Sequence, residues 1–200
     1  MKKFFALLFV FSLISFFALL LFFKDNYLYS GSLHLGMFSV AMFFLWKKDW
    51  KGTLNAIGVP GDLKNNIIYT IAGFFGLVAS LTLMFIAFQF FEIENDSGNV
   101  AEIIKGLPIF VPLLAIIIAP FTEELFFRAL LVPKIGIIPS ALVFSVSHLS
   151  YGSTAEIAGA LVVGILFGII YKYSKSVVPC ILVHFGYNLL SILVMLLVVS

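Results

Sequence analysis

Two glutamates and one arginine stand together in an apolar segment in the second half of the sequence. Glu123 and Glu124 are adjacent, and Arg128 follows Glu124 by four residues. Residues four apart share one face of a helix, so Glu124 and Arg128 are expected to form a structural ion pair. Glu123 then points to a different face without a local cation. A carboxylate of that kind in apolar surroundings is a candidate general acid or base.

Two histidines occupy two later apolar segments, each with a partner residue four positions away. Phe144 precedes His148, and Asn188 follows His184. The spacing lets the amide of Asn188 orient or hydrogen-bond whatever the ring of His184 holds. Polar side chains in three apolar segments predict one functional site rather than separate packing residues. The remaining histidine, His34, has no such company and is expected to be an interfacial residue.

The segments around these residues are those of a membrane protein. Hydrophobic residues make up 62% of the 200 residues, charged residues make up 11%, and the mean hydropathy is +1.15. One helical crossing needs roughly 20 apolar residues, so the chain has room for about six to eight crossings. The apolar runs are continuous rather than alternating, which favours helices over barrel strands. The predicted fold is all-α, a polytopic membrane bundle in one domain covering residues 1–200.

The apolar runs divide this domain into two parts. The N-terminal part, 1–106, is expected to hold membrane helices and a cytoplasmic loop or interfacial helix near 47–66. The C-terminal part, 107–199, carries the three groups of polar residues. The candidate spans are 4–23, 32–46, 67–91, 107–130, 137–149, 157–171 and 177–199.

The lysines predict the orientation in the membrane. Alternating the spans from a cytoplasmic N-terminus puts only Lys24 and Lys105 on the outer side, which agrees with the positive-inside rule. The lysines on the cytoplasmic side are Lys2, Lys3, Lys47, Lys48, Lys51, Lys64, Lys134, Lys172 and Lys175. At about 1.5 Å per residue, Glu123 and His184 lie roughly 10 Å from the cytoplasmic ends of their helices, and His148 about 16 Å. The three are expected to share a cavity in the cytoplasmic half of the bilayer, with water entering from that side.

The three motifs together resemble a known family. In order along the chain they read Glu123-Glu124-x-x-x-Arg128, Phe144-x-x-x-His148 and His184-x-x-x-Asn188. This set, on apolar helices, is similar to that of the CPBP intramembrane proteases, which group type II CAAX prenyl endopeptidases with bacteriocin-processing and immunity-associated (Abi) proteins. The resemblance covers about residues 107–199, and the N-terminal half matches only as generic membrane helices.

The resemblance implies an intramembrane endopeptidase that processes a membrane-associated or lipid-modified peptide. Glu123 and His148 would activate a water molecule, while His184 and Asn188 would stabilise the oxyanion. The remaining motif residues would support them: Glu124, Arg128 and Phe144. The expected partners are a peptide or lipidated protein substrate and the lipid bilayer, and a net charge of +2 gives no reason to expect nucleic acid.

A metal centre is the alternative to a glutamate base. Glu123, His148 and His184 could be zinc ligands, and zinc would lower the pKa of a bound water to about 7. No His-x-x-x-His or His-Glu-x-x-His pair stands in the sequence, so the ligands would have to come from three helices. A metal-free mechanism without a cofactor is therefore preferred, and zinc stays open.

Two other classes of function compete with the peptidase. One is a catalytically idle scaffold or bacteriocin-immunity protein that keeps the fold and binds a peptide or membrane protein. The other is a small proton-coupled transporter with Glu123 and the histidines as a relay, but no inverted repeat is visible in the sequence. The compact length and the composition rich in Lys, Phe and Ile favour a bacterial cell membrane as the location.

Overall fold

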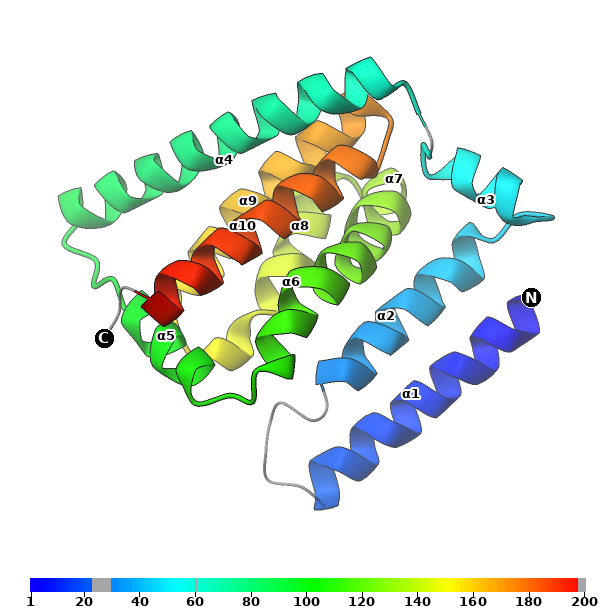
Figure 1. Ribbon diagram of the computed structural model, residues 1–200, viewed down its shortest axis with the longest axis horizontal. Coiled ribbons are helices and arrows are strands. Elements are labelled where there is room, and N and C mark those ends of the chain that lie inside the picture. Colours follow the sequence, from blue (N-terminus) through cyan, green and yellow to red (C-terminus); the bar gives the residue numbers. More distant parts are fainter. Residues whose placement is uncertain (23–29, 60, 198–200) are drawn as a thin grey trace.

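The computed structural model describes residues 1–22, 30–59 and 61–197 of the chain (Figure 1). These residues form helices and, within the described part, no strand. Hydropathy therefore predicts the all-α class correctly. The ends of the first and last predicted spans, at residue 23 and at 198–199, and Lys24 lie outside the described residues.

Five helical segments of the described chain are long and apolar enough to cross a membrane. They are α1 (Lys2–Phe22), α4 (Leu63–Phe90), the continuous segment Phe110–Ile135, α9 (Thr154–Ser174) and α10 (Val178–Leu197). Two shorter apolar helices accompany them, α2 (Ser30–Leu45) and the segment Ile137–Tyr151. Continuous backbone hydrogen bonding inside each helix is what lets such apolar segments stand in lipid, so the chain is an integral membrane protein.

Two small helices lie outside these segments. α3 (Trp50–Ala56) falls in the predicted loop near 47–66, and its N-cap Asp49 accepts a hydrogen bond from the backbone N–H of Gly52 at 2.7 Å. α5 (Ser97–Lys105) connects α4 to the segment that carries Glu123. Figure 1 shows them at opposite ends of the bundle, α3 beyond the end of α2 and α5 beside the end of α10.

The C-terminal helices pack around one apolar core between α4, α9 and α10. Its buried residues are Leu77, Val163, Phe167, Ile170, Cys180 and Val183. Close approach of α4 depends on Gly73, where a Cβ would stand 2.8 Å from Cδ1 of Ile170 and 2.9 Å from Cγ2 of Val183. Gly186 on α10 likewise allows the close approach of α4, because a Cβ there would stand 2.5 Å from Cζ of Phe74.

The N-terminal helices stand to one side of this core. α1 packs on α2, and α2 packs on the segment Phe110–Ile135. A second buried cluster joins α2 and α3 to that segment through Ala41, Ile57, Leu125, Ala129, Leu130 and Val177. The packing of α2 on the segment Phe110–Ile135 also brings His34, near the start of α2, beside Glu123.

The lysine-rich end of the bundle is joined by backbone contacts. The N–H of Val177 donates to the carbonyl of Ile57 at 3.1 Å. Gly58, with φ of +80°, lies so close to the carbonyl of Lys175 that a Cβ would overlap it. Only glycine takes that backbone conformation without strain, so the turn after α3 can lie directly on the turn between α9 and α10.

Asp96 joins the opposite end. Its carboxylate accepts hydrogen bonds from the Ser153 hydroxyl at 2.7 Å, the Thr154 N–H at 2.8 Å, the Thr154 hydroxyl at 3.1 Å and the Ala155 N–H at 3.0 Å. These bonds favour the charged form and hold the pKa of Asp96 well below its usual range. The connection between α4 and α5 thereby caps the N-terminus of α9.

Candidate active site

A change of helix type positions the two adjacent glutamates. α6 (Phe110–Glu123) ends at Glu123, and residues Glu124–Leu131 continue as a π-helix, η2. The spacing of Glu124 and Arg128, which placed them on one face of a helix, did not indicate this change of helix type. Pro120, one turn before Glu123, brings no N–H to the helix ladder. The carbonyl of Phe127, a residue of η2, accepts a hydrogen bond from the hydroxyl of Ser140 at 2.8 Å. Such π turns are frequent at functional sites.

The second motif glutamate lies in the protein core with Arg128. Oε2 of Glu124 stands 3.1 Å from Nε of Arg128, and the two side chains are 0% and 1% exposed. The guanidinium carbon lies 4.4 Å from the ring centroid of Phe144 and 5.2 Å from that of Phe167. The terminal guanidinium nitrogens have no hydrogen-bond partner among the described residues, so the rings stabilise the cation through their faces. The expected ion pair is present.

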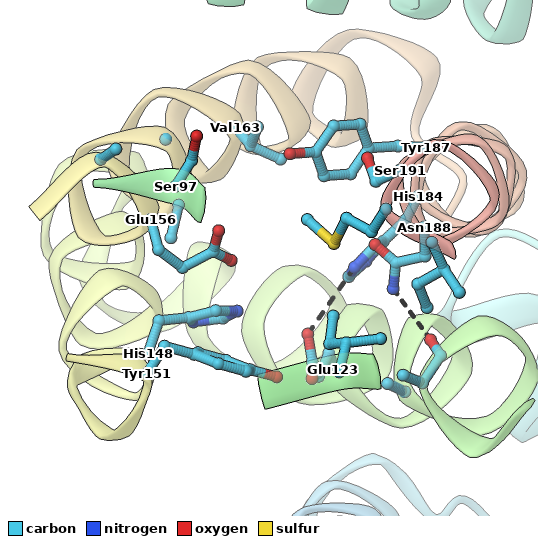
Figure 2. A pocket seen from close by; sticks show the side chains of 18 of the residues that line it. Ser97, Glu123, His148, Tyr151, Glu156, Val163, His184, Tyr187, Asn188 and Ser191 are labelled. Atoms are coloured by element: carbon cyan, nitrogen blue, oxygen red, sulfur yellow. Dashed lines mark hydrogen bonds and ion pairs between the residues drawn. The ribbon is translucent and has the colours of Figure 1, made fainter. Parts of the chain in front are cut away.

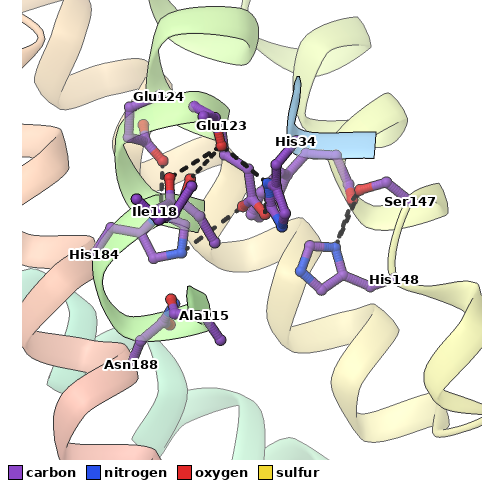
Figure 3. Close-up of polar contacts among 12 residues, drawn as sticks. His34, Ala115, Ile118, Glu123, Glu124, Ser147, His148, His184 and Asn188 are labelled. Atoms are coloured by element: carbon purple, nitrogen blue, oxygen red, sulfur yellow. Dashed lines mark hydrogen bonds and ion pairs between the residues drawn. The ribbon is translucent and has the colours of Figure 1, made fainter. Parts of the chain in front are cut away.

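Glu124 also holds His184, the second of the two motif histidines that line the site. Its Oε1 lies 2.8 Å from Nδ1 of His184. An ionised carboxylate only accepts, so this contact places a proton on Nδ1 and turns Nε2 of His184 towards Glu123 (Figure 3). Nε2 lies 3.9 Å from Oε2 of Glu123, which is longer than a hydrogen bond.

Glu123 stands between two histidines, one of which the sequence did not single out. Its side chain is 12% exposed, and its Oε1 lies 4.0 Å from Nδ1 of His34. That ring nitrogen is 2.9 Å from the hydroxyl of Thr122, and the same hydroxyl donates to the carbonyl of Ile118 at 3.0 Å. His34 is therefore a residue of the site, contrary to the interfacial position expected for it. Nothing in its local sequence signals this, because packing of α2 on α6 brings it there.

His148 follows α8 (Ile137–Val146) and precedes the short helix η3 (Leu149–Tyr151). Its Nδ1 lies 2.8 Å from the carbonyl of Phe144 and 3.2 Å from the hydroxyl of Ser147. A carbonyl only accepts, so Nδ1 carries the proton and Nε2 is left as an acceptor. The ring centroid of Phe144 lies 4.7 Å from that of His148, which places this phenylalanine between His148 and Arg128.

Asn188 lies one turn beyond His184 on α10. Its Nδ2 donates to the carbonyl of Ala115 on α6 at 2.8 Å. One of its two N–H groups is thus committed to fixing the amide, and the second stays available.

A cavity of about 330 Å³ unites these residues (Figure 2). Its lining includes all four predicted catalytic residues together with His34: Glu123, His148, His184 and Asn188. The structure brings Glu123 directly to His184, whereas His148 faces them across the cavity and has no direct contact with Glu123 among the described residues.

The cavity extends away from the lysine-rich end. It continues past Glu123 to the start of α2 at Ser30, the connection at Asn95 and Ser97, and the end of α10 at Met195. The expected opening towards the lysine-rich side is therefore wrong. The predicted span ended at residue 130. The helical segment continues to Ile135, so Glu123 lies farther from the lysine-rich end of its helix than expected.

The same geometry bears on whether the site could hold a metal ion. Zinc needs ligand atoms within about 2.0–2.2 Å of a single point. Among the described residues, no group of three or more His, Cys, Asp or Glu side chains is placed to hold a metal ion. The set Glu123, His148 and His184 therefore does not fit a zinc centre in this arrangement.

Comparison with known proteins bears on the second half of the chain. Residues 105–190 match the family model described as Type II CAAX prenyl endopeptidase Rce1-like. No curated protein and no solved structure matches the chain. The matched segment contains the three motifs, and at the level of the family it suggests an intramembrane endopeptidase. The resemblance to the CPBP proteases is confirmed at the level of this match: residues 105–190 of the membrane protein are similar to the Rce1-like type II CAAX prenyl endopeptidases.

Proposed function

We propose that the protein is an intramembrane endopeptidase in which Glu123 is the general base. One observation carries the proposal: Glu123 faces the cavity and His184, while the neighbouring Glu124 forms an ion pair with Arg128, the only arginine of the chain. The two glutamates thereby divide into a reactive group and a structural one. A carboxylate beside a shielded cavity, free of a strong cation, suits proton transfer.

Water activation is assigned to Glu123 and His148. Nε2 of His148 is the free acceptor of its ring, so it can hold one hydrogen of a water molecule while Glu123 removes the other proton. The water oxygen then bonds to the scissile carbonyl carbon. Glu123 returns the proton to the peptide nitrogen as the carbon–nitrogen bond breaks, which leaves a carboxylic acid and an amine. No step requires a metal.

Stabilisation of the oxyanion is assigned to His184 and Asn188. His184 can donate through Nε2 only when both ring nitrogens carry protons. The buried carboxylate of Glu124, at 2.8 Å from Nδ1, supplies the counter-charge for that form. The N–H of Asn188 that is not bonded to Ala115 is the second donor.

The substrate class follows from the site's place among apolar helices. A peptide must reach Glu123 inside the bundle, which suits a membrane-associated or lipid-modified chain. The description of the matched family suggests processing of a CAAX-type protein. Processing of a bacteriocin in a bacterial membrane is the second setting that we propose, from the resemblance of the three motifs to those of the CPBP proteases.

The cavity opens, in this proposal, on the extracytoplasmic side. Most lysines of the described residues lie near α3, α7 (Val132–Ile135) and the end of α9. The positive-inside rule places this end of the molecule in the cytoplasm. Ser97 and Asn95 lie at the other end, where the cavity emerges. Substrate and water would therefore enter from outside the cytoplasm.

Peptide cleavage by the purified protein tests the function. Wild type and Glu123→Gln, both in nanodiscs, are incubated with a pool of plain and prenylated peptides, and the products are identified by mass spectrometry. Glu102→Gln is the matched control, because Glu102 is an exposed glutamate of α5 outside the cavity. We expect fragments from wild type and control, none from Glu123→Gln, and no effect of a chelator. Absence of cleavage by a folded wild type would favour the scaffold function, and chelator sensitivity reversed by zinc would favour the metalloenzyme.

Cysteine labelling tests the side of access. Cys180 is buried and is the chain's one cysteine, so Cys180→Ala gives a silent background. Ser97→Cys marks the cavity mouth, and the exposed Lys48→Cys marks the other end. A membrane-impermeant maleimide added to intact cells should label the first and spare the second until the cells are permeabilised. The reverse pattern would contradict the proposed orientation.

A further inference from the structure

Glu156 is a carboxylate of the cavity that the proposed chemistry does not use. It lies in the first turn of α9, is partly buried, and lines the cavity. Figure 2 shows its side chain pointing into the open space on the side of His148, apart from Glu123. The residues that follow on the same helix face, Gly159 and Ala160, also line the cavity and leave room beside the carboxylate.

A glutamate at this position of a helix usually has a structural task. Ser153 is the N-cap of α9 and accepts a hydrogen bond from the Glu156 N–H at 3.1 Å. In a capping box, the glutamate side chain would in return accept from the Ser153 N–H. That second bond is not formed here, and Asp96 instead accepts from the Thr154 and Ala155 N–H groups. The cap of α9 thus leaves the carboxylate of Glu156 free.

No other described group forms a hydrogen bond or an ion pair with the Glu156 carboxylate. Within the described residues, the Glu156 side chain has neither a hydrogen bond nor an ion pair, and the cavity lining includes no lysine or arginine. A shielded carboxylate without a partner is costly, and a cation that enters the cavity removes that cost.

We propose that Glu156 binds a cationic side chain of the substrate peptide, a lysine or an arginine, next to the bond that is cut. The proposal rests on the proposed peptidase function. The aliphatic stem of such a side chain would lie along Gly159 and Ala160 while its charged end meets the carboxylate. Glu156 is a specificity residue in this arrangement and takes no part in proton transfer.

Matched peptides test this assignment. Starting from a peptide that wild type cleaves, each position near the cut is replaced in turn by lysine, by uncharged norleucine of similar length, or by glutamate. Cleavage is measured for wild type, Glu156→Gln, Glu156→Lys and the control Glu102→Gln, an exposed acid at the same end of the molecule. Binding of the lysine and norleucine peptides is also measured by fluorescence anisotropy on Glu123→Gln, with and without Glu156→Gln.

The expected result is a preference of about tenfold for lysine over norleucine at one position in wild type and in Glu102→Gln. Glu156→Gln should lose the preference and keep cleaving the norleucine peptide, and Glu156→Lys should prefer glutamate at that position. The anisotropy measurement should show the same loss. An equal slowing of all three peptides by Glu156→Gln would overturn the proposal, as would a wild type without preference at any position. If Glu123→Gln still cleaves the peptides, the proposed peptidase mechanism fails. The role of Glu156 is then judged separately, from the anisotropy measurements of lysine and norleucine peptide binding.

Discussion

Nδ1 of His184 lies 2.8 Å from Oε1 of Glu124, whose other oxygen stands 3.1 Å from Nε of Arg128. One buried carboxylate therefore connects a ring of the cavity to a guanidinium enclosed by phenylalanines. The adjacent Glu123 instead faces the cavity, between His34 and His184. This division of labour explains why a site of this kind needs two glutamates in succession and an arginine four residues later.

Removing Arg128 should destabilise the protein through Glu124. Arg128→Met leaves the Glu124 carboxylate buried without its cation, and we expect the free energy of unfolding to fall by about 3–5 kcal/mol. The double variant Glu124→Gln/Arg128→Met removes both charges and should regain most of that loss. It should stay inactive, because a neutral amide cannot balance a doubly protonated His184. Denaturant unfolding and cleavage rates check both statements, and a double variant no more stable than Arg128→Met would refute the coupling.

His34 should matter for activity although it lies in the N-terminal half. It flanks Glu123 at 4.0 Å and is held by the Thr122 hydroxyl, so His34→Gln is expected to lower kcat by roughly tenfold. Gly31→Ala, in the same helix, is the control, because a Cβ there meets nothing within 4 Å. Equal rates for His34→Gln and wild type would show that α2 only supports the fold.

Acid should loosen the N-terminal end of α9 through Asp96. Hydrogen bonds from Ala155, Ser153 and Thr154 lower the pKa of Asp96 in the folded protein. Asp96 therefore makes its full contribution to stability when the pH is above the pKa of an ordinary aspartate, about 3.9. The contribution is lost as the pH falls from there towards the folded pKa. The hydrogen-exchange protection factor of the amides in the first turn of α9, which is corrected for the intrinsic exchange rate at each pH, should therefore fall below about pH 4. Asp96→Asn should show fast exchange already at pH 7 and little further change; unaltered exchange in this variant would contradict the role.

Hydropathy and motif spacing anticipated much of this arrangement for a physical reason. Long apolar runs must close their backbone hydrogen bonds within one helix, so the helices follow from composition. Charged groups inside such runs must meet partners, and the four predicted catalytic residues indeed line one cavity. The i, i+4 pair of Glu124 and Arg128 was also local enough to be foreseen.

Features set by packing between distant segments were not foreseen. His34 joins the site through the packing of α2 on α6, which no local pattern encodes. The end of the molecule that the cavity reaches was not foreseen either, because it depends on how Ser30, Asn95, Ser97 and Met195 from separate segments come together in its lining. Glu156 was not singled out from the sequence, and the capping of α9 by Asp96 is what leaves its carboxylate free.

The rate of peptide cleavage by Glu123→Gln tests the central claim most directly. The variant keeps the size and polarity of the side chain and removes its basicity. For a peptide cleaved by wild type, kcat should fall by about 10³-fold, while the melting temperature and the peptide affinity stay close to those of wild type. A Glu123→Gln protein that cleaves within about tenfold of wild type would contradict the assignment of Glu123 as the general base.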